Sequence, residues 1–111
     1  VDHNEYITGI KEVYRVLKNN GMFFSYTVGQ DSTVFNNYQP AVKIDDYTLN
    51  GIFRENSPFS GNHYPFHFWN KTDYKSTVTK VGFKVDYIES TKKTYYGGKE
   101  FVEYISTYSI K

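Results

Sequence analysis

A continuous apolar and aromatic run at residues 22–28 constrains the fold of this chain more than any other feature. The run reads MFFSYTV and follows Asn19-Asn20-Gly21. Uninterrupted runs of this length are typical of a strand that is covered on both faces, as in a parallel sheet. We therefore expect these residues to lie inside a sheet, with neighbours on both faces and along both edges.

Residues 4–18, directly before this run, have the pattern of an amphipathic helix. Apolar side chains recur at the spacing of one helical face. They are Tyr6, Ile10, Val13, Tyr14 and Leu17. Asp2 and Glu5 are placed as a capping box at the start of this helix, and Gly21 can take the left-handed conformation of a helix end. A helix, a short turn and a buried strand make up half of a βαβ unit.

Residues 72–81 predict a second helix. Thr72 is placed as its N-cap, and Asp73 suits the positive end of the helix dipole. Gly82 is expected to end it.

Two alternating segments follow this helix and predict an antiparallel hairpin. Residues 83–91 place Phe83, Val85 and Tyr87 on one side. Residues 101–110 also alternate and share one apolar face, formed by Val102, Tyr104, Tyr108 and Ile110. Residues 92–99, which include Gly97-Gly98, supply the turn between the two strands.

The segment from residue 29 to residue 66 has no strong periodicity. Glycine and proline divide it into short pieces, and residues 42–53 are expected to hold a short helix or strand. Long segments of this kind in compact domains are usually lids or binding loops. We therefore interpret residues 30–69 as a lid or substrate-binding insertion within a single domain.

The composition excludes several classes of protein. The 111 residues include 12 Tyr and 9 Phe, an aromatic content that disordered chains lack. The chain has no Cys, which excludes disulfides and thiolate chemistry and is consistent with a cytoplasmic location. The formal net charge is +1, without a concentrated basic stripe, so we expect no nucleic-acid partner. No apolar stretch approaches the ~20 residues that cross a bilayer, so we expect no membrane partner either.

Three segments resemble class I S-adenosylmethionine-dependent methyltransferases. EVYRVLKNNGMFFSYTVG, from Glu12 to Gly29, is similar to the family's helix after the fourth strand and its fifth strand. FWNKTDYKSTVTKVGFKVDYIES, residues 68–90, resembles the next helix and the sixth strand, and FVEYISTYSI resembles the antiparallel seventh strand. The chain departs from the family where Asn19-Asn20 replace the usual Pro-Gly before Gly21.

The resemblance implies an α/β fold that is the C-terminal part of a Rossmann-like methyltransferase sheet. The family binds S-adenosylmethionine through a glycine-rich turn and an acidic strand end in its first half, and this sequence contains neither. Residues 1–111 are therefore expected to be the C-terminal half of a methyltransferase domain, with no cofactor-binding residue of their own. The expected strand order is fifth, seventh, sixth, with the seventh antiparallel to both neighbours.

Such a half would leave the edge of the strand at residues 22–28 free, and exposed apolar edges recruit partners. We expect the missing N-terminal half to cover this edge. Without that half, the isolated chain should be insoluble, molten or self-associated through the edge. We also expect it to be inactive on its own.

The resemblance implies methyl transfer from S-adenosylmethionine to a small-molecule substrate. His63 and His67, in the expected lid, are candidate substrate contacts, because a histidine can deprotonate a nucleophile near neutral pH. Tyr38 and Arg54 could hold a flat or anionic substrate. Tyr26 lies near the carboxyl end of the strand, where ligands of parallel sheets bind. No residue is assigned a catalytic role. A metal site is not expected, since His63 and His67 lack further ligands.

Two other interpretations stay open. An independent α+β binding module could use exposed Tyr and Phe side chains to hold sugars or peptides. Such a module would be monomeric and would have no empty sheet edge. The chain could also be a non-catalytic, methyltransferase-like partner subunit.

Overall fold

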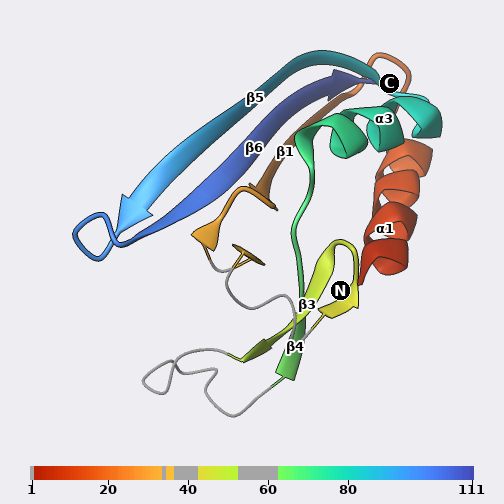
Figure 1. Cartoon of the computed structure of the whole chain (residues 1–111). Helices are drawn as coiled ribbons and strands as arrows, with labels where there is room; N and C mark the ends of the chain where they lie inside the picture. The colour runs from red at the N-terminus through yellow and green to blue at the C-terminus, as the bar shows by residue number, and fades with distance from the viewer. Residues whose placement is uncertain (1, 34, 37–42, 53–62) are drawn as a thin grey trace.

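The computed structural model describes residues 2–33, 35–36, 43–52 and 63–111 (Figure 1). The strands form two three-stranded sheets, ordered β1-β6-β5 and β2-β3-β4, and every pairing inside them is antiparallel. In chain order the elements are α1 (His3–Val16), β1 (Met22–Gly29), β2 (Lys43–Asp45), β3 (Thr48–Ile52), β4 (His63–His67), α3 (Lys71–Val81), β5 (Lys84–Tyr95) and β6 (Glu100–Ile110).

A capping side chain starts each helix. The Asp2 carboxylate accepts a hydrogen bond from the Glu5 amide at 2.9 Å, as the sequence predicts. The cap of α3 is Asn70, and the prediction of Thr72 is wrong. The Asn70 side chain accepts from the amides of Thr72 and Asp73, which places Thr72 inside the first turn. Gly82 ends α3 with a φ of 131°, a conformation that favours glycine.

The larger sheet has the strand order that the resemblance implies. β6 lies between β1 and β5 and is antiparallel to both. Met22 pairs with Ile110 at one end of β1, and Gly29 pairs with Glu103 at the other. Among the described residues no strand pairs with the second edge of β1, apart from a single parallel bridge between Gly29 and Trp69.

α1 and α3 pack against one face of this sheet, which we call the inner face. Ile10 of α1, Val78 of α3 and Ile105 of β6 are buried in one cluster with the aromatic rings of Trp69 and Tyr74. The β6 residues on this face are mostly small and polar, yet Thr107 and Ser109 are each only 1% exposed. The helices therefore bury the more polar face of β6.

The opposite, outer face of the sheet is exposed. Met22, Phe24 and Tyr26 alternate along β1 with exposures of 60%, 64% and 50%. The expectation that both faces of this strand are covered is therefore wrong for the described chain. The physical reason is that both described helices pack on the inner face, so the apolar side chains of the outer face meet solvent.

The β5–β6 hairpin is confirmed, but its details differ from the prediction. β5 continues to Tyr95, and the turn needs only the residues after it, with φ values of 54° at Tyr96, 67° at Gly97 and 86° at Gly98. A register shift between Val85 and Tyr87 breaks the predicted alternation. Val85 packs against the core, whereas Tyr87 is 51% exposed.

β2, β3 and β4 lie in the segment that the sequence interprets as a lid. β2 and β3 fall within residues 42–53, where a short helix or strand is expected. Thr48 of β3 pairs with His67 of β4, and Leu49 pairs with Phe66. Leu49 packs with Phe35 and Phe68 in a second, smaller core cluster. In the part of the chain that the structure describes, no helix is long and apolar enough to span a membrane.

Candidate functional site

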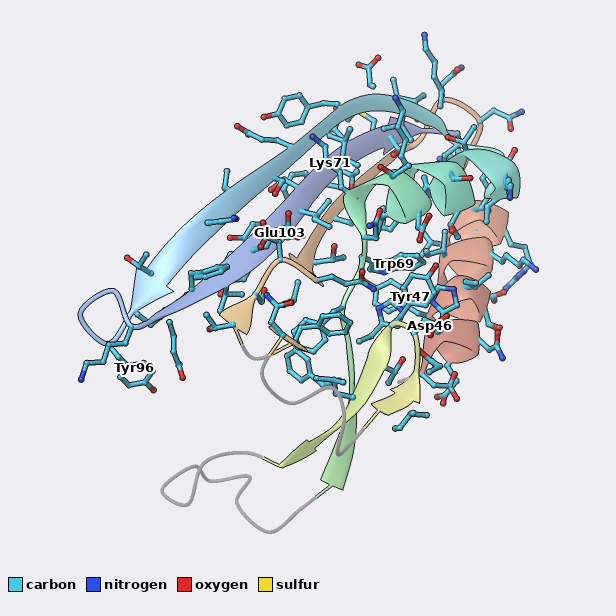
Figure 2. All side chains as sticks on the ribbon, viewed as in Figure 1. Asp46, Tyr47, Trp69, Lys71, Tyr96 and Glu103 are labelled. Carbon is cyan, nitrogen blue, oxygen red and sulfur yellow. The ribbon has the colours of Figure 1, made fainter. Side chains whose placement is uncertain are left out.

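Two histidines and three aromatic residues meet between α1 and the smaller sheet, and we call this group the His–aromatic cluster. Its members are His3, Tyr6, Tyr47, His67 and Trp69. They come from the first two turns of α1, the β2–β3 turn, the end of β4 and the residues after β4. Figure 2 shows Tyr47 and Trp69 near one another, between the β2–β3 hairpin and α1.

Main-chain hydrogen bonds place the cluster at the carboxyl end of β1. The Trp69 amide donates to the Val28 carbonyl at 2.9 Å, and the Gln30 amide donates to the Trp69 carbonyl at 2.9 Å. The Phe68 amide donates to the Tyr47 carbonyl at 2.7 Å, which ties the β2–β3 turn to the same place. In open α/β sheets this end of a strand is where ligands bind.

A direct hydrogen bond joins the two histidines. His3 Nδ1 and His67 Nε2 are 2.8 Å apart, and the two rings are nearly parallel at 8°. The ring of Tyr47 stacks on His3 at 3.9 Å between centroids, and the ring of Trp69 lies 4.7 Å from that of His67. Tyr6 approaches His67 from α1 at 4.8 Å. Four aromatic rings thus surround or flank the buried His67.

Burial keeps His67 neutral. Its side chain is 9% exposed, and burial, followed by repulsion from His3, lowers its pKa from 6.5 to about 4. Burial likewise raises the pKa of Tyr6 to about 12. The pKa of Tyr47 also rises to about 12, chiefly because its hydroxyl donates to Asp73 at 2.7 Å. At neutral pH these three side chains therefore carry no charge.

Asp45 contacts the start of α1 beside the histidines. Its carboxylate accepts from the Tyr47 amide at 2.8 Å and from the His3 amide at 3.4 Å. Burial alone would raise the pKa of Asp45, but these hydrogen bonds outweigh burial and lower it. Asp45 is therefore ionised at neutral pH and holds the β2–β3 turn against the start of α1.

The hydrogen-bond pattern favours one tautomer of His67. Its Nδ1 is buried and has no hydrogen-bond partner among the described residues. Neutral imidazole has one N–H donor and one acceptor nitrogen, and a buried N–H without a partner is rarer than an unpaired acceptor. His67 is therefore best assigned with its proton on Nε2, donating to His3 Nδ1, and with a free lone pair on Nδ1.

The sequence singled out five residues as substrate contacts, and the structure places one of them in the His–aromatic cluster. His67 lies in the His–aromatic cluster. His63 belongs to β4 and pairs with Ile52, but its side chain, like Tyr38 and Arg54, lies outside the described residues. Tyr26 is on the outer face of the sheet, where its half-exposed ring stacks on Tyr104 at 4.9 Å.

Sequence reasoning missed His3 and Tyr6 as members of a site, whereas Tyr47 lies in the segment interpreted as an aromatic-lined lid. Tyr6 has the spacing of a core residue in α1, and His3 precedes the apolar pattern. The hydrogen bond between His3 and His67 joins residues that are 64 positions apart. The only sequence signal was the small number of histidines, three in the whole chain.

Two glycines at the ends of elements are packed against side chains of the same chain. Gly29 ends β1, but a Cβ there would meet the Glu103 carboxylate, so this glycine accommodates another part of the same chain. Gly82 is packed in the same way against the Tyr14 ring. No group of three His, Cys, Asp or Glu side chains in the described ranges is arranged to hold a metal ion.

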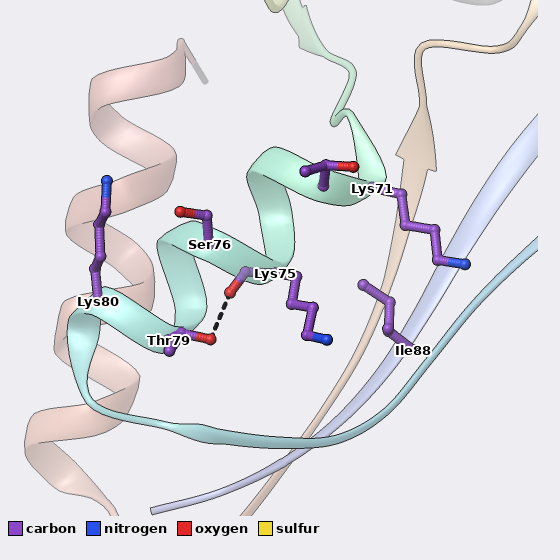
Figure 3. A pocket seen from close by; sticks show the side chains of 7 residues that line it. Lys71, Lys75, Ser76, Thr79, Lys80 and Ile88 are labelled. Carbon is purple, nitrogen blue, oxygen red and sulfur yellow. Dashed lines mark hydrogen bonds between the residues drawn. The ribbon is translucent and has the colours of Figure 1, made fainter.

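A separate open groove runs along α3 beside β5 (Figure 3). It has a volume of about 800 Å³ and contains no member of the His–aromatic cluster. Its lining residues are Lys71, Thr72, Lys75, Ser76, Thr79, Lys80 and Ile88. The groove is open and lined by three lysines, and the buried His67 does not line it.

Comparison with known proteins supports the fold. No protein-family model matches the chain, and no curated protein sequence does. The crystal structure of a SAM-dependent methyltransferase from Methanosarcina mazei matches with a TM-score of 0.73 and 20% sequence identity. The match covers 99% of this chain and 52% of that chain, so the chain spans about half the length of the solved protein. The chain therefore has a mixed α/β fold similar to part of a methyltransferase.

Proposed function

We propose that this chain is the acceptor-side half of a methyltransferase that transfers a methyl group from S-adenosylmethionine to a small-molecule substrate. The observation that carries the proposal is the structural match. Nearly all of this chain superimposes on about half of a SAM-dependent methyltransferase. The β1-β6-β5 order, with both helices on one face, supports the same C-terminal position in a Rossmann-like sheet.

The position of the His–aromatic cluster supports an acceptor-side role. The cluster lies at the carboxyl end of β1, and His67 offers a buried, neutral nitrogen without a partner among the described residues. The donor S-adenosylmethionine would supply the methyl group from a site outside this chain, as the resemblance to the C-terminal half of the family implies. His63, Tyr38, Arg54 and Tyr26 stay predictions as further substrate contacts.

The contribution of this half to the rate would be positioning. Holding an acceptor in line with a reactive group can lower a barrier by several kcal/mol, roughly 7–11 in the best intramolecular cases. The cluster is suited to this role because its rings are fixed by stacking and by main-chain hydrogen bonds from three segments.

The edge of β1 and the outer face of the sheet are the proposed contact surfaces for the other half of the enzyme. Phe24, at 64% exposure, is the most exposed side chain of β1 among the large apolar ones. In the absence of a partner, the same surface would promote self-association. A cytoplasmic location is part of this proposal and stays a prediction.

The exposed aromatic residues also favour a second candidate, a non-catalytic binding module or a methyltransferase-like partner subunit. Tyr26, Tyr87 and Phe24 all lie on the outer face and are at least half exposed. Aromatic side chains of this kind are enriched in protein interfaces. The two candidates differ in whether a complete assembly binds S-adenosylmethionine.

Calorimetry separates these possibilities. We expect no saturable heat when S-adenosylmethionine is titrated into the 111-residue chain, and clear saturation would contradict the half-enzyme proposal. The chain is then co-expressed with the part of the M. mazei protein that lies outside the match. We expect a complex that binds S-adenosylmethionine, and a stable complex without binding would favour the non-catalytic candidate.

A further inference from the structure

We propose that the free edge of β5 binds an extended, acidic segment of a partner protein as an additional strand, and that Lys71 and Lys75 of α3 hold its carboxylates. This edge is the opposite end of the larger sheet from β1. The inference therefore does not depend on the proposed function, which uses the edge of β1.

The edge of β5 offers main-chain groups for pairing. β5 is 12 residues long and lies at the end of the β1-β6-β5 order. Within the described ranges it pairs with β6 alone. An edge strand carries a row of N–H and C=O groups, and an extended chain can pair with them by β-augmentation.

The groove along α3 lies beside this edge strand. Six of its lining residues belong to α3, and the seventh, Ile88, belongs to β5. Figure 3 shows Lys71 and Lys75 extending from α3 toward Ile88, whereas Lys80 extends on the other side of the helix. A strand added to β5 would therefore pass beside the ammonium groups of Lys71 and Lys75.

These two lysines occupy electrostatically unfavourable positions. Lys71 is the first residue of α3, where the helix dipole disfavours a positive charge. Lys75 follows at the i,i+4 spacing, at which like charges repel each other. Both are exposed, and neither forms an ion pair with a described residue. None of the residues that line the groove is acidic. The groove is thus complementary to a ligand that brings its own negative charges.

The spacing of the lysines matches an extended peptide. Lys71 and Lys75 are about 6 Å apart along the helix axis, at 1.5 Å per residue, and alternate residues of a strand are about 6.6 Å apart. The 11 residues of α3 span about 16 Å, which is the length of about five residues of strand. Two acidic side chains separated by one residue would therefore reach both lysines.

The alternation of a strand defines the remaining positions. Ile88 packs against the core on the inner face, whereas the preceding residue, Tyr87, is exposed on the outer face. An added strand would place every second side chain beside Ile88 and the two lysines, and the others beside Tyr87. β-branched or aromatic side chains suit the second set, because they form favourable cross-strand pairs with tyrosine. The expected segment alternates acidic residues with residues of this kind.

The charges on β5 argue against two other occupants. β5 carries Lys84, Lys92 and Lys93 against only Asp86 and Glu89. Lysines on an edge strand oppose pairing between copies of one chain, and the lysines of α3 would add to this repulsion. A nucleic acid would neutralise the lysines, but it has no peptide groups with which to extend the sheet.

Peptide titrations followed by fluorescence anisotropy test the occupant. The probe is a labelled, threonine-rich peptide in which one threonine separates two glutamates, and it is titrated with the 111-residue chain. We expect saturable binding that weakens as the salt concentration rises. A peptide of the same composition with adjacent glutamates places them on opposite faces, so it should bind up to about fivefold more weakly. Equal binding of the two peptides, or no saturable binding of the first, would overturn the proposal.

Methylated peptides test the main-chain pairing. In an extended peptide, the N–H groups of alternate residues point to opposite edges, so only one set can pair with β5. N-methylation of that set removes about two or three hydrogen bonds and should weaken binding by more than about tenfold, whereas methylation of the other set should not. Equal effects of the two sets would overturn strand addition. Tighter binding of a single-stranded oligonucleotide than of the unmodified peptide would overturn the class of partner.

Variants of α3 test the role of the lysines. Lys71→Ala combined with Lys75→Ala should weaken binding by about tenfold, since each exposed ion pair is worth a factor of up to about five. Lys11→Ala combined with Lys18→Ala removes the same charge from α1, outside the groove, and should leave binding unchanged. Equal losses in the two variants would show an effect of net charge alone and would overturn the site.

Stability separates recognition from a structural role. The double alanine variant of α3 should unfold no more readily than the unmodified chain, because alanine favours the helix and the repulsion is removed. Lys71→Glu combined with Lys75→Glu should bind a peptide in which lysines replace the two glutamates, and failure of this reversal would overturn the assignment. None of these measurements involves the methyl donor, so their failure leaves the proposed function untouched.

Discussion

The inner and outer faces of the β1-β6-β5 sheet differ in burial although both carry apolar side chains. The inner face carries small polar side chains such as Thr107 and Ser109 beside apolar ones such as Phe23 and Ile105, and it is buried under α1 and α3. The outer face carries Phe24, Tyr26 and Tyr87, and each of these three side chains is half exposed or more. Which of the two faces is buried in this chain thus follows from where α1 and α3 pack.

Several hydroxyl groups of the inner face are hydrogen-bonded, although the buried Ser109 Oγ has no partner among the described residues. Ser25 of β1 bonds to the Tyr74 hydroxyl at 2.6 Å and also to Thr107 of β6. Buried polar groups with partners cost little, whereas an exposed aromatic face offers apolar area for another surface to cover. The outer face is therefore the surface on which the proposed contact with a partner can be tested.

The largest expected effect is on the inner face. Ile105→Ala removes a fully buried side chain from the core cluster, and we expect it to lower the free energy of unfolding by about 2–5 kcal/mol. Urea unfolding followed by circular dichroism measures this change. Val16→Ala, at an exposed apolar position of α1, is the control and should change stability by less than about 0.5 kcal/mol. Equal losses in the two variants would break the comparison.

The second prediction concerns pH. The folded pKa of His67, about 4, lies below its unfolded value of about 6.5, so the unfolded chain binds the proton more readily in between. Stability is therefore full above pH 6.5 and is lost as the pH falls toward 4. We expect a loss of about 1–2 kcal/mol from this residue, allowing for its partial contact with solvent. Urea unfolding between pH 7 and pH 4 should show a smaller loss in His67→Gln. An identical pH profile would contradict the low pKa.

The third prediction sharpens the account of the polar inner face. Tyr74→Phe removes the hydroxyl that bonds to Ser25 and keeps the ring in the core. We expect a loss of about 1 kcal/mol in the free energy of unfolding, the usual net value of such a bond. Tyr87→Phe, at an exposed position of the outer face, is the matched control and should be nearly neutral. A neutral Tyr74→Phe would show that these hydroxyls do not account for the burial.

The smallest effect on stability is expected on the outer face. Phe24→Glu should change the free energy of unfolding by about 0.5 kcal/mol or less, while it reduces self-association and the binding of the dye ANS. Val16→Glu changes an equally exposed apolar side chain, 63% against 64%, on a helix instead of the sheet. Light scattering and dye fluorescence compare the two variants. Similar behaviour of both would mean that the outer face is not a particular interaction surface.

Much of the fold followed from local patterns. The Asp2 cap, the apolar face of α1, the strand at residues 22–28 and the final hairpin were all predicted, with ends that differ by a few residues. The resemblance predicted the β1-β6-β5 order. The cap of α3 was assigned two residues late, because Asn70 and Thr72 are both good capping residues and only the geometry separates them.

The candidate site was less predictable. His67 was identified as a candidate substrate contact, although the structure of its segment was not predicted. Its partner His3 was not identified as a candidate. The β-bulge that turns Tyr87 outward has no signal in the sequence. Val85 and Tyr87 are two residues apart, so simple alternation predicts that both lie on the same face. Residues 43–52 and 63–67 have too little periodicity to reveal a three-stranded sheet on their own.

By itself, the sequence determined which segments form the two long helices, the first strand and the final hairpin, to within a few residues, because capping and periodicity act over a few neighbouring residues. The end of α1 differs from the prediction, since Leu17 caps it in an extended conformation and Asn20, not Gly21, has a positive φ. The tertiary structure decided which face of the sheet is buried and which two histidines share a proton. Both depend on contacts between segments far apart in the chain, such as residues 3 and 67, and no local pattern records them.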